Sequence, residues 1–107
     1  MKHCSLLLIY LLSFIASAQN NDLIKRINNY PKQDTTRVEL LIDYCVDNTF
    51  AVSDKMLKFA KEAYTISKKT NYIKGEIRSL NCIGNYYYQQ SIFDKAIEFY
   101  TKAIRIA

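Results

Sequence analysis

Apolar residues recur every three or four positions through most of the chain after residue 20, which is the period of an α-helix. The first firm example has Val38, Leu41, Ile42 and Cys45 at i, i+3, i+4 and i+7. The sequence lacks the apolar–polar alternation between paired turn residues that marks strands. The pattern therefore predicts an all-α fold.

Residues that cap or end helices separate these apolar stripes. A weak stripe over residues 21–30 ends at Pro31, and Asp34 is placed to accept hydrogen bonds from the free N–H groups of the next helix. Ser53 and Asp54 open a second helix in the same way. After a connecting segment over 19–33, the predicted helices run over 35–46, 54–70, 73–89 and 93–107.

Two segments of the chain resemble each other at a distance of forty residues. Residues 54–63 and 94–103 are identical at four of ten positions, and Leu57 and Ile97 form a conservative fifth pair. A period near this length is a signature of stacked helical repeats. It predicts an α-solenoid of about two helical hairpins, over residues 34–70 and 71–107.

The second hairpin carries a specific set of large and small residues. The set is Leu80, Ile83, Gly84 and Tyr87 on its first helix, and Ala96 and Tyr100 on its second. We expect Gly84 and Ala96 to let the helices approach closely, with Phe93 among the large side chains filling the space around them. This spacing resembles the tetratricopeptide repeat. The resemblance implies a right-handed superhelical scaffold that binds proteins or peptides and performs no chemistry itself.

The first hairpin resembles the repeat less closely. Met56, Ala60 and Ala63 match on its second helix, whereas its first helix has no glycine. We therefore expect residues 34–70 to be a divergent repeat-like hairpin. Because the period exceeds the 34 residues of the standard repeat, we expect an extension in the connection over residues 70–74.

The first eighteen residues have the form of a cleavable signal peptide. A basic start is followed by an apolar run over 6–15 and by the small residues 16–18, which predicts cleavage before Gln19. The apolar run is too short to cross about 30 Å of hydrocarbon as a helix. The sequence thus predicts export to the periplasm or cell envelope.

Charge and composition exclude several classes of function. The net charge of +5 falls to +4 without Lys2, and basic and acidic residues alternate along the helices, which indicates solvated faces and no nucleic-acid site. The one histidine, His3, lies in the predicted signal peptide. No phosphate-binding loop, metal-ligand spacing or nucleophile motif occurs, and Asp43 and Asp47 are interpreted as solvated charges on the outer surface. We predict no enzyme activity, catalytic residue, cofactor or metal.

Two cysteines remain beyond the predicted signal peptide, Cys45 and Cys82. An exported protein meets an oxidising environment, so they can form a disulfide. Both also lie in apolar helical stretches, where cysteine commonly acts as a small buried hydrophobe. The sequence leaves both alternatives open.

A polar stripe on the third predicted helix is the candidate binding surface. Its members, at i, i+3, i+7 and i+10, are Arg78, Asn81, Asn85 and Tyr88. They lie on a different face from the repeat residues, and in the family resembled here this face lines the concave groove. A guanidinium, two amides and a phenol can hold a peptide backbone or carboxylate. An ordinary solvated helix face has the same pattern.

The signal peptide, the segment 30–38 and the long repeat period together resemble the N-terminal sensor regions of exported bacterial tetratricopeptide-repeat proteins. Such regions often precede a membrane span and a histidine kinase or regulator, neither of which the sequence contains. We therefore expect the N-terminal part of a longer sensor, with Ile104 and Ile106 facing a further neighbour. The alternative is a structural module that self-associates and has no ligand groove.

Overall fold

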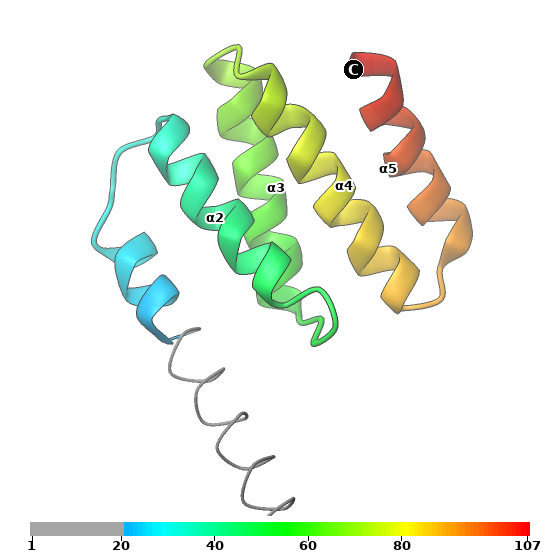
Figure 1. Cartoon of the computed structure of the whole chain (residues 1–107), viewed down its shortest axis with the longest axis horizontal. Helices are drawn as coiled ribbons and strands as arrows, with labels where there is room; N and C mark the ends of the chain where they lie inside the picture. The colour runs from blue at the N-terminus through cyan, green and yellow to red at the C-terminus, as the bar shows by residue number, and fades with distance from the viewer. Residues whose placement is uncertain (1–20) are drawn as a thin grey trace, which may run out of the picture.

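Residues 21–107, the part described in this computed structural model, form a stack of helices without a strand (Figure 1). A helix over residues 21–28 precedes four longer ones. These are α2 (Thr35–Asp47), α3 (Asp54–Lys69), α4 (Ile73–Gln89) and α5 (Phe93–Ile106). The all-α prediction is confirmed, whereas the predicted signal peptide over 1–18 lies outside the described residues.

The helices α2 and α3 start where the capping residues in the sequence predicted a helix start. The Asp34 carboxylate accepts a hydrogen bond from the Arg37 N–H at 3.2 Å, and the Ser53 hydroxyl accepts one from the Met56 N–H at 3.3 Å. Each satisfies a donor that a helix N-terminus leaves without an intrahelical partner. Local sequence thus sets the start of α2 and α3.

The next two connections use a different device, a residue with left-handed backbone conformation. Asn71 has φ 55° between α3 and α4, and Ser91 has φ 61° between α4 and α5. In each turn the following residue's N–H bonds back to the preceding helix, from Tyr72 to Ser67 at 2.8 Å and from Ile92 to Tyr87 at 2.9 Å. The two turns are equally short. The predicted extension at 70–74 is wrong; the longer connection is 48–53, between α2 and α3.

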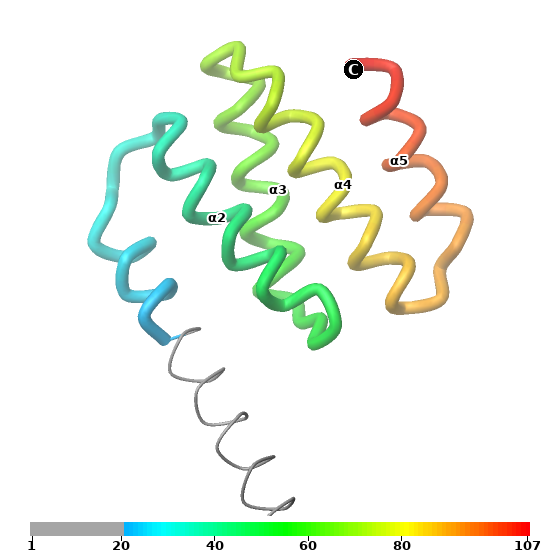
Figure 2. Tube along the Cα trace, viewed as in Figure 1, coloured from blue at the N-terminus to red at the C-terminus, as the bar shows by residue number. Residues whose placement is uncertain are grey.

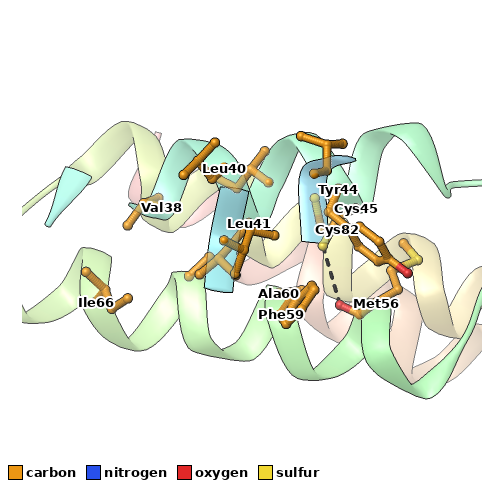
Figure 3. Packing of buried hydrophobic residues seen from close by; sticks show 14 of the residues in the cluster. Val38, Leu40, Leu41, Tyr44, Cys45, Met56, Phe59, Ala60, Ile66 and Cys82 are labelled. Atoms are coloured by element: carbon orange, nitrogen blue, oxygen red, sulfur yellow. Dashed lines mark hydrogen bonds between the residues drawn. The ribbon is translucent and has the colours of Figure 1, made fainter. Parts of the chain in front are cut away.

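Successive helices pack against each other, and α2 also contacts α4 across the stack. Figure 2 traces this order from α2 to α5, with helix 21–28 beside α2. The buried residues of the core come mainly from helix 21–28, α2, α3 and α4 (Figure 3). Among residues 21–107, no helix is long and apolar enough to cross a membrane.

Arg37 ties helix 21–28 to the rest of the molecule. Its Nη1 donates to the carbonyls of Ile27 at 2.9 Å and Tyr30 at 2.7 Å, while its Nε bonds Glu62 of α3 at 2.8 Å. Leu23 and Ile27 are buried in the core at the same contact. The predicted N-terminal segment therefore covers the outer side of α2 with an apolar face.

Glycine allows close helix contacts at two places. A Cβ at Gly84 would lie 2.5 Å from the Tyr100 ring, which confirms the predicted approach of α4 and α5, and Ala96 is buried there. A Cβ at Gly75 would lie 2.2 Å from the Ser67 hydroxyl, a contact that sequence analysis missed. The expectation that Phe93 fills the space around the α4–α5 contact is wrong, because this side chain is 52% exposed. It starts α5 at the rim and packs against the ring of Tyr88.

The side of the stack at α5 leaves large apolar side chains uncovered. Ile97 and Ile104 are 62% and 73% exposed, while Ile106 is partly buried. Leu57, the counterpart of Ile97 forty residues earlier, packs against the core. Equivalent positions of the two hairpins therefore differ: Leu57 packs against the core in the first, whereas Ile97 is exposed in the second.

Candidate functional site: the polar face of α2 and α4

The four predicted groove residues all lie on α4, but the structure does not present them as one free stripe. Asn81 and Tyr88 are exposed. Arg78 and Asn85 are partly buried and bond neighbouring helices. Helical spacing therefore identifies the side of α4 on which they lie, and the neighbours decide which side chains stay available.

Arg78 belongs to a charged cluster that joins the two hairpins. Its Nη1 donates to Glu39 Oε2 of α2 at 2.7 Å, and the Tyr72 hydroxyl donates to Glu39 Oε1 at 2.5 Å. Burial by itself would raise the pKa of Glu39, but the hydrogen bonds from Tyr72 and Arg78 outweigh it and hold that pKa below the usual 4.5. The bond to Glu39 in turn raises the pKa of Tyr72.

Sequence analysis did not find Glu39 or Tyr72. No spacing within one helix points to this cluster, because its members meet only when the second hairpin stacks on the first. The one indication in the sequence was that the first helices of the two hairpins carry opposite charges. Which of these charges pair depends on how the second hairpin is positioned on the first. The cluster holds Arg78 in place and leaves 34% of its side chain exposed.

We expect Glu39→Gln to destabilise the fold by less than about 1 kcal/mol at pH 7, because the pair is partly exposed and screened. The folded state lowers the pKa of Glu39, so the stability that its charge contributes is present above the unfolded value near 4.5. That contribution is lost as the pH falls through the lower, folded value. Urea unfolding of both proteins at pH 7 and pH 3 checks this. A larger difference in the free energy of unfolding between the two proteins at pH 3 than at pH 7 would contradict this prediction.

The other end of α4 is tied to α5. The Tyr100 hydroxyl donates to Asn85 Oδ1 at 2.5 Å, so this amide orients the ring that packs on Gly84. Tyr88 meets Phe93 edge to face at 5.6 Å between ring centroids, with more than half of its surface exposed. The exposed Tyr88 ring, and the exposed Asn81 amide about two turns earlier on α4, can contact a peptide without breaking a structural bond.

A shallow hollow of about 420 Å³ lies where α2 meets helix 21–28. It is lined by Asp22, Leu23, Arg26, Asp43 and Asp47. Asp43 and Asp47 of α2 are exposed, as predicted, and they line this surface hollow. Within the described part of the chain, no group of three metal-ligating side chains comes together.

The α4–α5 hairpin also has a counterpart among known families. Residues 77–107 match the family model named Tetratricopeptide repeat. The match supports the tetratricopeptide-repeat family. It begins in the first turns of α4 and covers all of α5, so it includes Leu80, Ile83, Gly84, Ala96 and Tyr100.

No curated protein and no solved structure matches the chain. The all-helical stack is compatible with tetratricopeptide-like hairpin repeats, in which α2 and α4 are the first helices of successive hairpins. Repeats of this family are typically interaction scaffolds without catalytic activity. The match thus supports a protein–protein interaction role.

Proposed function

We propose that this protein is an exported scaffold that binds an extended protein segment along the side of α4 carrying Asn81 and Tyr88. The observation that carries the proposal is the tetratricopeptide match over residues 77–107. The polar side chains of α4 give the bound segment its contacts. Asn81 offers an amide to a peptide backbone, Tyr88 offers an exposed ring, and Arg78 offers a partly exposed basic side chain.

The binding test starts from peptides selected by display on the full chain. We expect Tyr88→Ala to weaken binding of a selected, fluorescein-labelled peptide by on the order of tenfold or more, since exposed aromatics dominate such interfaces. Asn81→Ala should weaken it less. Fluorescence anisotropy measures both affinities.

Lys58→Ala, at an exposed position of α3, is the matched control and should leave the affinity unchanged. Circular dichroism confirms that each variant is folded. Failure to select any peptide, or equal affinity of all variants, would contradict the proposed face. Arg78→Ala and Asn85→Ala are weaker tests, because both side chains also bond neighbouring helices.

We propose further that residues 1–18 direct export and that the protein works in the cell envelope as part of a sensor. The basic start, the apolar run and the small residues before Gln19 support this. The mass of the chain recovered from the periplasm after expression in a Gram-negative bacterium tests it. A chain beginning at Gln19 is expected, and an uncut chain confined to the cytoplasm would refute it.

Self-association is the second candidate function. The exposure of Ile97 and Ile104 on α5 favours it, because contiguous apolar surface is a common feature of interfaces between proteins. Light scattering across a range of concentrations distinguishes the two functions. A monomer at all concentrations would exclude this candidate without affecting the peptide face.

A further inference from the structure

Cys45 of α2 and Cys82 of α4 meet inside the core. Their side chains are 0% and 5% exposed, and both are free thiols in this structure. Both belong to the same buried cluster, where α2 packs against α4. Figure 3 shows them between the helices, with the Cys45 thiol donating to the Met56 carbonyl of α3 at 3.4 Å. The chain thus places its two core thiols at the contact between hairpins.

We propose that Cys45 and Cys82 are a redox-active pair that closes to a disulfide and covalently joins the first helices of the two hairpins. The bond needs the two sulfur atoms to approach to about 2.05 Å. Packing of α2 against α4 already brings the pair together, so the closure asks for a small local shift and no rearrangement of the fold.

The chemistry is a thiol–disulfide exchange with a small or protein disulfide as oxidant. The Cys82 thiolate attacks one sulfur of the oxidant and expels the first thiolate, which gives a mixed disulfide. The Cys45 thiolate then attacks the Cys82 sulfur and expels the second thiolate. Two thiols are oxidised to one S–S bond, the oxidant is reduced to two thiols, and the two protons pass to them.

The surroundings assign the order of these steps. Residue Cys82 is 5% exposed, whereas Cys45 is fully buried. Contact with the Cys45 thiol lowers the pKa of Cys82, and the positive charge of Arg78 acts in the same direction, while burial opposes both. Contact with the Cys82 thiol, followed by burial, raises the pKa of Cys45. Cys82 is therefore the attacking residue and Cys45 the resolving one.

Closing the pair has a mechanical consequence. The Glu39–Arg78 ion pair and the Cys45–Cys82 contact both join α2 to α4. A covalent bond there fixes the position of one hairpin on the other and stabilises the stack by restricting the unfolded chain. This inference does not depend on peptide binding.

The test uses the full chain with Cys4→Ser, so that Cys45 and Cys82 are its only cysteines. The folded protein is incubated with oxidised dithiothreitol or glutathione disulfide. We expect loss of both thiols, a monomer lighter by the mass of two hydrogens, and a peptide map that links Cys45 to Cys82. The Tm should rise by on the order of 10 °C and return on reduction.

Adding Cys82→Ser provides the control, whose Tm should not respond to the oxidant except through adducts visible by mass. If this variant does not fold, the peptide map and the reversible Tm shift of the Cys4→Ser protein still decide the matter. Retention of both thiols in the native protein, alongside their loss in denaturant, would overturn the proposal. Disulfide-linked dimers, or a Tm that falls on oxidation, would also overturn it.

Discussion

Gly75→Ala is expected to lower the free energy of unfolding by about 1–3 kcal/mol, the usual cost of overpacking a well-filled contact. A Cβ there would lie 2.2 Å from Ser67 Oγ, 2.6 Å from the Tyr72 ring and 3.0 Å from Val38 Cγ1. Ser67 and Val38 are fully buried, so neither can move aside easily. Alanine's better helix propensity, worth up to about 1 kcal/mol, offsets only part of this cost.

A double-mutant cycle with Ser67→Ala makes this prediction specific. The Ser67 hydroxyl is the atom nearest the new methyl group, and it is buried without a hydrogen-bond partner. Ser67→Ala alone should therefore be neutral or stabilising, and it should recover part of the loss caused by Gly75→Ala. Urea unfolding monitored by circular dichroism gives the four free energies. Strict additivity of the two changes would show that they do not meet at this contact.

Gly84→Ala is the matched comparison within the same helix. Its new methyl group would meet the Tyr100 ring, whose nearest atom lies 2.5 Å away. That ring is partly exposed, so it can swing outward at the expense of its bond to Asn85. We expect a smaller loss than at Gly75. A loss at Gly84 that exceeds the loss at Gly75 would reverse our ranking of the two contacts.

These two glycines show how far the sequence determines the fold. Gly84 belongs to a repeat pattern within one hairpin, and its role as a close-contact point for Tyr100 follows from spacing alone. Gly75 meets residues of α2 and α3 from the preceding hairpin, so its role depends on how the hairpins stack. Helix positions were predictable because apolar period and capping are local. The left-handed backbone conformation of Asn71 and Ser91 in the turns was not, because neither position has the glycine that usually marks it.

The candidate site divides along the same line. Helical periodicity placed Asn81 and Tyr88 on the exposed side of α4, where the structure has them. It also placed Arg78 and Asn85 there, although Glu39 and Tyr100 engage them. Their partners lie on other helices, which one helix's period cannot reveal. The contact between the two core thiols was undecidable for the same reason, since each cysteine alone looks like a small buried hydrophobe.

Ile83→Ala is expected to have the largest effect of any single change considered for this chain. Ile83 is 2% exposed in the core and belongs to the tetratricopeptide match. Its truncation removes buried methyl groups and leaves a cavity, at a cost of about 2–5 kcal/mol. Against a typical total stability of about 5–15 kcal/mol, a loss of this size leaves the native state marginal at 37 °C. Thermal and urea unfolding measure it.

Ile97→Ala removes the same atoms from a side chain that is 62% exposed on α5, and it should change stability by less than about 0.5 kcal/mol. Because self-association would bury Ile97, both variants should be measured at low and high protein concentration. A loss for Ile97→Ala that grows with concentration would show that a second copy covers α5, since association stabilises the folded state by mass action. If both variants lost the same free energy of unfolding at every concentration, Ile83 could not be a core residue while Ile97 is an uncovered surface residue, and the prediction would be contradicted.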